Sequence, residues 1–337
     1  MKVCLYFESE KLIQTSGIGR AQSHQKKALE SVGIPYTTDP AEDFDILHIN
    51  TLGMTSAPLI IKTHLEGKPV IYHAHSTEED FKNSFVLSNQ IAPFFKILIV
   101  NLYSMAELLI TPTPYAKSLL DNYGIDKPIL PISNGIEIAR YQRDEEKIKA
   151  FRKYFSLKKD QKVVMGVGFY FERKGIIDFI ETARKNPDVI FIWFGYTPSI
   201  YLKVKVRAAI EDSPSNVLLP GYVKGPIIEG AYSDVDAFFF PSLEETEGIV
   251  VLEALASKCP VIVRDIGAFD PWLIHEVNCL KAVDVEGFST QIRRVINKQI
   301  NTTEAGFKTA KERDLPEIGK QLKAAYEKVL SMPIRKE

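Results

Sequence analysis

The chain has 337 residues, of which 45% are hydrophobic and 25% are charged, and its 42 Lys and Arg residues nearly balance its 43 Asp and Glu residues. This length has room for two domains of roughly 100 to 200 residues, each with a core of its own. A formal net charge of -1 argues against a general nucleic-acid binder, because neutralising phosphates requires an excess of cations.

The first part of the chain alternates short apolar runs with longer amphipathic stretches, the pattern of a parallel sheet covered by helices. The runs predict strands at Val3 to Phe7, Ile46 to Ile49, Val70 to His73, Leu108 to Thr111 and Ile129 to Ile132. Between the first two, residues Ala21 to Val32 have helical apolar spacing and stop at Gly33, so we predict a helix there.

The same alternation restarts after a charged, weakly patterned segment from Arg140 to Lys162. It predicts strands at Val163 to Val167, Val189 to Phe194, Val217 to Leu219, Ala237 to Phe240 and Val261 to Val263, and helices at Ile249 to Ser257 and Leu315 to Leu330. We therefore predict an α/β protein with two doubly wound domains, residues 1–139 and 140–312. A C-terminal helix within 313–337 is expected to pack back towards the first domain.

The three cysteines, Cys4, Cys259 and Cys279, lie far apart in apolar runs, which indicates buried thiols rather than a zinc site. The longest apolar stretch, from Ile91 to Tyr103, is interrupted by Pro93 and Lys96. A membrane-spanning helix needs about 20 apolar residues, so we expect nothing to span a bilayer, although a segment could lie on one.

Two glycines, Gly17 and Gly19, stand between the first predicted strand and the first helix. Glycines there let the backbone approach a ligand, and a helix N-terminus presents N–H groups to a phosphate. The third glycine of a dinucleotide fingerprint is missing, because Ser23 and His24 stand in its place. A plain turn and a phosphate-binding loop both remain open.

Two adjacent cations, Arg173 and Lys174, follow the first strand of the second domain. Ligands bind outside the carboxyl ends of the strands in an open parallel sheet, so these cations are placed to meet an anion. An arginine offers a bidentate fork for phosphate, and the lysine adds a compact charge. The alternative is an ordinary solvated pair.

The segment from Pro241 to Ala254 joins a predicted strand to a helix that starts near Gly248. Glu245 lies in the loop and Glu253 within the helix, eight positions apart, so both could face one ligand across the helix start. Capping of the helix dipole accounts for Glu247. It does not account for Glu253, since a carboxylate on an otherwise apolar helix is costly unless a donor meets it.

These features occur in the order seen in glycosyltransferase family 4, which the chain resembles over nearly its whole length. The resemblance rests on the glycine loop, His73-Ala74-His75-Ser76, Ser133-Asn134-Gly135-Ile136, Glu172-Arg173-Lys174-Gly175 and the glutamates Glu245 and Glu253. The family has the GT-B fold, in which two Rossmann-like domains face each other across a cleft, and its enzymes retain the anomeric configuration. The resemblance thus implies a hexosyltransferase that depends on a nucleotide sugar.

The resemblance also implies roles for particular residues. It places Glu245 and His75 at the donor sugar, Glu253 at the nucleotide ribose and Tyr222 at the base. The diphosphate would be met by Arg173, Lys174, the backbone N–H groups of Gly248, Ile249 and Val250, and the Gly17 and Gly19 loop. His75, Arg173, Lys174 and Glu245 are the predicted catalytic residues.

Two departures from the family pattern leave the donor sugar open. Phe169 stands where the family usually has an arginine after the strand glycine, which suggests that Arg173 has taken over part of the phosphate role. The Pro-Glu pair that often follows the later glycine loop is replaced around Gly267 to Trp272. Glucose and galactose differ in the orientation of one hydroxyl, and the sequence does not choose between them.

Catalysis is expected to need neither a metal nor another cofactor, with a UDP-hexose as donor substrate. The Asp234-Val235-Asp236 triplet, the nearest candidate for a DxD motif, runs into a predicted buried strand, so it does not imply a divalent ion. Preorganised cations and helix N–H groups aimed at the leaving diphosphate would provide the stabilisation. A front-face route, in which the leaving phosphate takes the acceptor proton, is favoured over Glu245 as a covalent nucleophile.

The acceptor prediction rests on residues 85–109, an apolar stretch in the first domain. A core helix is one interpretation, and an interfacial helix that admits a lipid is the other, with Phe94, Phe95, Lys96 and Ile99 as predicted membrane and acceptor residues. Residues 1–139 carry 11 basic and 15 acidic side chains, so attachment would depend on apolar insertion and local cations.

Within the family, the segments His73 to Phe81 and Thr111 to Tyr115 resemble those of Gram-positive enzymes that add a second hexose to a monohexosyl-diacylglycerol, making the lipoteichoic acid anchor. From this resemblance we expect a glycolipid acceptor, monoglucosyl-diacylglycerol, and a cytoplasmic enzyme that is peripheral on the inner face of the cell membrane. A transferase for a soluble or polysaccharide acceptor, a silent sugar-nucleotide binder and a nicotinamide oxidoreductase are the alternatives.

Overall fold

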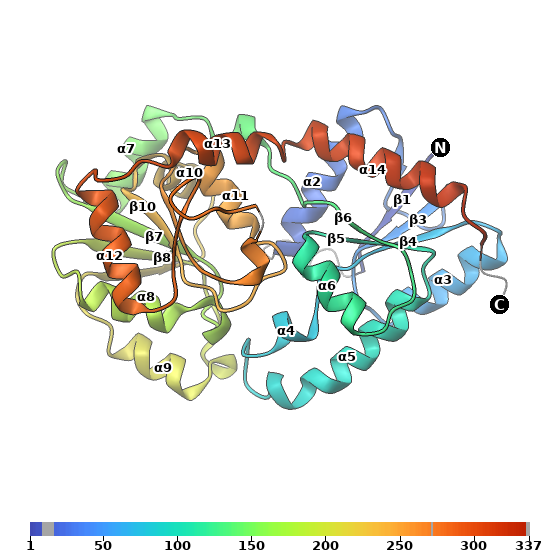
Figure 1. The fold of residues 1–337 in the computed structure, drawn as a ribbon, viewed down its shortest axis with the longest axis horizontal. Coiled ribbons are helices and arrows are strands. Elements are labelled where there is room, and N and C mark those ends of the chain that lie inside the picture. Colours follow the sequence, from blue (N-terminus) through green and yellow to red (C-terminus); the bar gives the residue numbers. More distant parts are fainter. Residues whose placement is uncertain (9–16, 271, 335–337) are drawn as a thin grey trace. The chain divides into compact units, whose positions relative to one another are not determined.

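The computed structural model describes residues 1–8, 17–270 and 272–334. The chain divides into two compact units, each built round a six-stranded sheet whose strands pair in parallel (Figure 1). Unit 1 comprises Met1–Phe81, Ile91–Glu137 and Arg313–Glu337, and unit 2 comprises Lys82–Gln90 and Ile138–Glu312. The predicted α/β class with two parallel sheets is confirmed.

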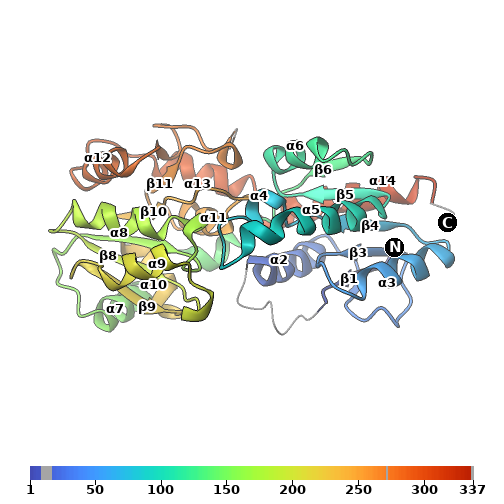
Figure 2. The same ribbon diagram turned by 90° about the horizontal axis from the view of Figure 1, so that it is seen from below.

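The sheet of unit 1 has the strand order β2-β1-β3-β4-β5-β6. Its strands are β1 (Val3–Tyr6), β2 (Tyr36–Thr37), β3 (Ile46–Ile49), β4 (Val70–His73), β5 (Leu108–Thr111) and β6 (Ile129–Pro131). All except β2 carry labels in Figure 2. The five longer strands match the predicted runs to within a residue. A strand of two residues is too short to show an apolar pattern, so β2 escapes prediction.

Helices cover both faces of this sheet. Helices α2 (Gly17–Ser31) and α14 (Leu315–Leu330) bury apolar side chains against one face, and α3 (Ser56–Leu65), α5 (Ser88–Ser104) and α6 (Pro114–Asn122) against the other. A short helix, α4 (Glu78–Phe81), follows β4. Both faces of the sheet are therefore buried, which explains the continuous apolar runs of its strands.

The last helix, α14, belongs to unit 1 although it follows unit 2 in the sequence. The N–H of Ile136 donates to the carbonyl oxygen of Arg313 (2.9 Å), so two distant segments pair just before α14 begins. Gly135 has a φ of 74°, and a Cβ there would lie 2.8 Å from Cγ1 of Ile318. Glycine is required at this crossing, and α14 then lies along α2 (Figure 1).

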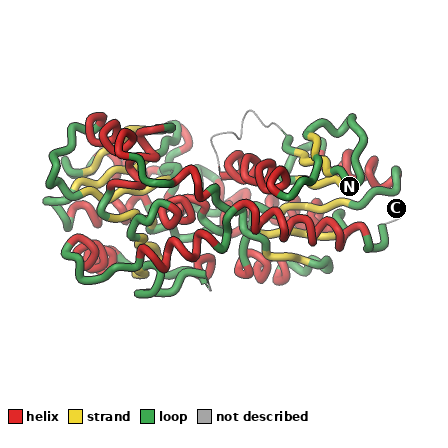
Figure 3. The backbone as a smooth tube through the Cα atoms, turned by 90° about the horizontal axis from the view of Figure 1, so that it is seen from above, coloured by secondary structure: helices red, strands yellow, loops and turns green. Residues whose placement is uncertain are grey.

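Unit 2 has the strand order β12-β11-β10-β7-β8-β9. Its strands are β7 (Val163–Val167), β8 (Ile190–Phe194), β9 (Val217–Gly221), β10 (Ala237–Phe240), β11 (Val261–Arg264) and β12 (Leu280–Ala282). Its helices are α7 (Glu145–Tyr154), α8 (Ile176–Arg184), α9 (Val204–Glu211), α10 (Pro226–Asp234), α11 (Ile249–Ala256), α12 (Val285–Ile296) and α13 (Thr303–Lys311). Helices flank the strands of this sheet in Figure 3 as well. Strand β12 was absent from the predicted set, being short and only partly apolar.

The segment from Lys82 to Gln90 groups with unit 2, whereas the predicted boundary near residue 139 puts it in the first domain. The carbonyl oxygen of Asn83 accepts from the N–H of Arg173 (3.0 Å), and the N–H of Val86 donates to the carbonyl oxygen of Tyr201 (3.2 Å). These are contacts of backbone groups, which any residue type can make. The sequence pattern therefore gives no sign of them.

Candidate functional site

Two loops of unit 2 meet beside strands β7 and β10: the first follows β7 and the second follows β10. These strands are neighbours in the sheet, yet the chain continues from β7 to β8 on the other side, which makes this place a topological switch point. Ligands of open α/β sheets bind outside the strand ends at such a point. Gly175 follows the first loop with a φ of 76°, and a Cβ there would lie 2.2 Å from the carbonyl oxygen of Pro241 in the second loop. Only glycine allows this approach.

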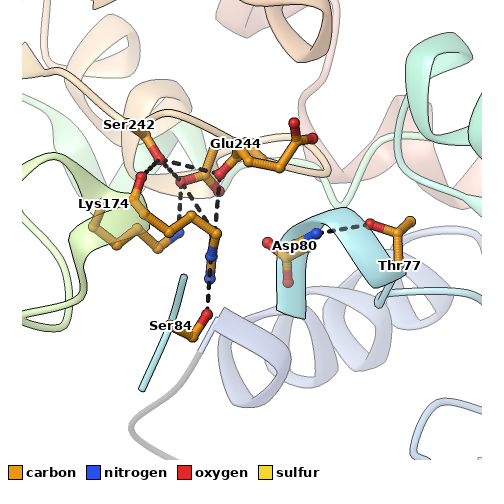
Figure 4. A network of polar contacts seen from close by, with 8 residues as sticks. Thr77, Asp80, Ser84, Lys174, Ser242 and Glu244 are labelled. Carbon is orange, nitrogen blue, oxygen red and sulfur yellow. Dashed lines mark hydrogen bonds and ion pairs between the residues drawn. The ribbon is translucent and has the colours of Figure 1, made fainter. Parts of the chain in front are cut away.

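Glu245 is the centre of the resulting polar cluster, of which Figure 4 labels Lys174, Ser242 and Ser84. Its Oε1 accepts from Nζ of Lys174 (2.5 Å) and from Oγ of Ser242 (2.7 Å), and Nη1 of Arg173 lies 3.9 Å away. Burial opposes ionisation of this carboxyl, but the two cations outweigh burial and hold its pKa below the ordinary value. The cluster therefore keeps a buried carboxylate between two cations.

Arg173 is itself buried, with 7% of its surface exposed. Its Nε donates to Oγ of Ser84 (3.1 Å), and its Nη1 donates to the carbonyl oxygen of Glu244 (3.0 Å). Ser84 comes from the Lys82–Gln90 segment, so this segment of unit 2 fixes the direction of the guanidinium. Several donors with fixed partners make a rigid cation that reorganises little when it meets negative charge.

Helix α11 begins beside the cluster. Gly248 precedes it with a φ of 87°, and Ile249 and Val250 form its first turn, where backbone N–H groups have no partner within the helix. Glu253 lies further along and is 3% exposed, with the hydroxyl of Tyr232 donating to its Oε2 (2.8 Å). The Tyr232 hydroxyl therefore provides the hydrogen-bond donor that a buried carboxylate on this apolar helix needs.

Unit 1 presents uncharged groups at the carboxyl ends of β3 and β4. His75 follows β4, its Nε2 lies 3.1 Å from Oδ1 of Asn50, and its ring stacks on that of His73 with centroids 4.1 Å apart. Burial lowers the pKa of His75 to about 3, so its imidazole is neutral over the physiological range. Gly17 and Gly19 lie in the first turn of α2, and the residues just before them lie outside the described part of the chain.

Comparison with known proteins matches each half of the chain to a glycosyltransferase family. The family described as Glycosyl transferases group 1 matches residues 147–313, and that described as Glycosyltransferase Family 4 matches residues 39–140. The chain is also 46% identical over 334 residues to the processive diacylglycerol alpha-glucosyltransferase of Acholeplasma laidlawii, covering 98% of this chain and 99% of that one. The chain belongs to glycosyltransferase family 4.

A further relative and a solved structure extend the comparison, the structure for the fold alone. The chain is 25% identical over 232 residues to the alpha-galactosylglucosyldiacylglycerol synthase of Streptococcus pneumoniae, covering 67% of this chain and 61% of that one. The crystal structure of HepE from Anabaena in complex with UDP covers 97% of this chain and 100% of its own, with a TM-score of 0.77 at 18% identity. The predicted GT-B fold class and the predicted glycosyltransferase are thus confirmed.

In this family 4 member, the structure brings Arg173, Lys174 and Glu245 into one cluster and sets Glu253 apart on Tyr232. Tyr222 follows β9 and is exposed. Ser242 and Ser84 are partners of these groups that were not predicted from the sequence. Ser242 had a detectable signal, because a serine after a strand end can cap the loop that it opens, whereas nothing near Ser84 in the sequence points to residue 173.

The predicted membrane and acceptor residues of α5 divide between two faces of that helix. Phe94 is 73% exposed, whereas Ile99 is fully buried in the core, so the prediction that Ile99 forms a membrane surface is wrong. Phe95 is half-buried and stacks on Phe81, and Nζ of Lys96 lies 3.5 Å from the Glu78 carboxylate. Among residues 1–8, 17–270 and 272–334, no helix has the length and apolarity needed to cross a bilayer.

Proposed function

We propose that this family 4 glycosyltransferase transfers a hexose, glucose or galactose, from a UDP-sugar to a diacylglycerol-based glycolipid, with monoglucosyl-diacylglycerol as the acceptor and a dihexosyl-diacylglycerol as the product. One observation carries the proposal: the chain aligns end to end, at 46% identity, with a diacylglycerol alpha-glucosyltransferase. The partial match to a galactosylglucosyldiacylglycerol synthase supports the same class of acceptor.

The cluster in unit 2 supplies what the departing diphosphate needs. Negative charge grows on the leaving group, and cations fixed in advance stabilise it without reorganising. Lys174 and Arg173 fill this role, and the N–H groups of Gly248, Ile249 and Val250 add the positive end of the α11 dipole. The UDP of HepE, which has the same fold, is a nucleotide diphosphate of the proposed kind.

The contacts of Glu245 favour positioning over covalent attack. Lys174 and Ser242 both donate to its Oε1, which lowers the availability of that oxygen as a nucleophile. A carboxylate so held can orient the sugar through a hydroxyl. We therefore propose retention by a front-face route, in which the acceptor hydroxyl attacks the anomeric carbon, the C–O bond to UDP breaks, and a diphosphate oxygen takes the acceptor proton.

A matrix of substrates tests the proposal most directly. UDP-glucose and UDP-galactose are each offered with diacylglycerol, monoglucosyl-diacylglycerol and soluble sugars, and the products are read by mass. We expect one added hexose on the glycolipid. Products formed only on soluble sugars would mean that the acceptor is a soluble sugar and not a glycolipid. Donor binding without turnover on any acceptor would indicate a catalytically silent sugar-nucleotide binder.

Membrane contact belongs to the exposed face of α5. Phe94 and Ile97 are 73% and 60% exposed, one helical turn apart, and apolar side chains in that arrangement insert at the depth of lipid head groups. Peripheral attachment at the inner face of the cell membrane, where a UDP-sugar and a diacylglycerol lipid meet, follows from this face together with the proposed substrates.

Flotation with vesicles tests the membrane contact. The double variant Phe94→Asp with Ile97→Asp should stay at the bottom of the gradient, whereas the wild type should float with the vesicles. Met54→Asp is the matched control, because Met54 is an exposed apolar residue of unit 1 outside α5. Equal flotation of the double variant and the wild type would contradict the contact through α5.

A further inference from the structure

Three histidine rings form a continuous stack inside unit 1. His48 lies on β3, His73 ends β4, and His75 follows it. The rings of His48 and His73 have centroids 5.4 Å apart with an interplanar angle of 3°, and those of His73 and His75 are 4.1 Å apart at 4°. Only His75 belongs to the predicted site, so the other two rings need an explanation.

Hydrogen bonds beside the stack define the protons of these rings. Nε2 of Gln25 donates to Oδ1 of Asn50 (2.7 Å) and to Nδ1 of His73 (2.8 Å), which uses both amide hydrogens. Nδ2 of Asn50 donates to the carbonyl oxygen of His48 (3.4 Å), so Oδ1 is the atom of Asn50 that faces His75.

This orientation of Asn50 determines the tautomer of His75. Oδ1 of Asn50 is an acceptor only, and Nε2 of His75 lies 3.1 Å from it. Nε2 must therefore carry the proton, and Nδ1 keeps a lone pair. A neutral imidazole in this form can accept a hydrogen bond from a hydroxyl of a sugar.

The surroundings oppose a second proton on the stack. Burial lowers the pKa of His48 and of His75 to about 3 and that of His73 well below its ordinary value. A proton on His75 would lower the pKa of His48 further, and a proton on His75 or His48 would lower that of His73 further. A titratable group packed against the stack is Tyr326 of α14, whose hydroxyl lies 2.8 Å from Nδ1 of His48.

We propose that Asn50 is a positioning residue that holds His75 as its Nε2–H tautomer, with Gln25 and the stacked ring of His73 as its support. Nδ1 of His75 then accepts a hydrogen bond from a hydroxyl of the transferred hexose. The part that concerns the hexose rests on the proposed function, while the tautomer is a property of unit 1 alone.

Nuclear magnetic resonance of protein labelled with ¹⁵N at histidine tests the tautomer without any substrate. Long-range ¹H–¹⁵N spectra distinguish a protonated from a bare ring nitrogen, and His75→Gln identifies the His75 signals among the six histidines. We expect protonated Nε2 and bare Nδ1 across the neutral range, and a mixture of tautomers in Asn50→Ala. A Nδ1–H tautomer in the wild type, or a titration near the ordinary histidine pKa, would overturn the inference whatever the acceptor proves to be.

Two variants of Asn50 then test the effect on catalysis. Asn50→Ala should lower kcat by roughly 10- to 100-fold, the usual cost of removing a group that orients another, with the donor KM almost unchanged. Asn50→Asp keeps an acceptor but its carboxylate favours the protonated ring. It should recover activity in mild alkali and lose it on acidification, a pH limb that the wild type lacks.

The control is Thr111→Val, which removes another buried polar group at the end of the neighbouring strand β5. It should keep the wild-type kcat and pH profile. Equal losses in Asn50→Ala and Asn50→Asp without a pH limb, or the same loss in Thr111→Val, would reduce Asn50 to a structural residue. A fully active His75→Ala would overturn the role of His75 in the proposed function, and the spectra would still decide the tautomer.

Discussion

Both units present side chains beside the ends of parallel strands, but these side chains are charged in unit 2 and neutral in unit 1. Unit 2 surrounds Glu245 with the cations Lys174 and Arg173. Unit 1 surrounds His75 with an amide and stacked neutral rings. The same sheet architecture thus supports a charged cluster in one unit and a neutral one in the other.

The difference matches the two chemical parts of a sugar nucleotide. A leaving diphosphate gains charge during transfer, so fixed cations stabilise it. The hexose carries uncharged hydroxyl groups, which hydrogen bonds of defined direction can distinguish and a bare charge cannot. The proposed function therefore assigns charge stabilisation to unit 2 and recognition of a hydroxyl to unit 1.

The largest expected effect comes from removing the cation of unit 2. Lys174→Ala should lower kcat/KM by roughly 10²- to 10³-fold, because removing one preorganised donor from a developing charge typically costs that much. Steady-state kinetics with the UDP-sugar measure it. Lys149→Ala, which removes an exposed lysine of the same unit, is the control and should behave as wild type. Near-normal kinetics of Lys174→Ala would place the charge stabilisation elsewhere.

Acid should destabilise unit 1 through its neutral rings. The unfolded chain binds protons at the ordinary histidine pKa of 6.5, whereas folded His48 binds one only near 3, so the free energy of unfolding falls as the pH drops from 6.5 towards 3. Each such ring contributes up to about 1.4 kcal/mol per pH unit in that window. Denaturant unfolding at several pH values measures the slope.

Substitution at His48 checks the origin of this acid sensitivity. His48→Gln should reduce the slope by the contribution of one ring, while His275→Gln, at an exposed histidine of unit 2, should leave it as in the wild type. An unchanged slope in His48→Gln would mean that the buried stack does not cause the acid sensitivity.

A smaller effect is expected from the partner of Arg173. Ser84→Ala removes the hydroxyl oxygen that accepts a hydrogen bond from Nε of Arg173. Loss of a hydrogen bond to a charged group should lower kcat/KM by roughly tenfold. Ser213→Ala, which removes a hydroxyl bonded to the carbonyl oxygen of Ile210, is the matched control. The same loss in both variants would exclude a specific role of Ser84.

The smallest expected effect is that of a chelator. If Lys174, Arg173 and the α11 N–H groups stabilise the diphosphate as proposed, EDTA should leave kcat/KM unchanged, and added Mg²⁺ or Mn²⁺ should not raise it. The assay uses the UDP-sugar and the glycolipid acceptor. Loss of activity with EDTA and its recovery with either metal would transfer the charge stabilisation from these residues to a bound ion.

Most strands and the cluster of unit 2 could be predicted from local patterns. Apolar runs are visible in the sequence because both faces of a parallel sheet are buried. Arg173, Lys174 and Glu245 could be proposed because each follows a strand and carries a formal charge. Asn50 and Gln25 could not, since an amide between strands looks like any polar loop or helix residue.

Helix α5 shows a further limit of sequence patterns. Phe94 and Ile99 are both large and apolar, and nothing in the sequence shows that one is exposed and the other buried. The orientation of the helix on its sheet decides this, and that orientation depends on the packing of distant side chains. Prediction of an apolar helix was therefore possible, while prediction of its exposed face was not.

The two parallel sheets, the family and the charged residues could all be predicted from the amino-acid sequence, because they depend on apolar periodicity and on groups whose chemistry is evident from their identity. Which groups meet was visible only in the folded chain. Folding brings Ser84 within hydrogen-bond distance of Arg173, Asn50 of His75, and Tyr326 of His48, which is 278 positions away in the sequence. Hydrogen bonds depend on distance and direction in space, and neither is written in the order of residues.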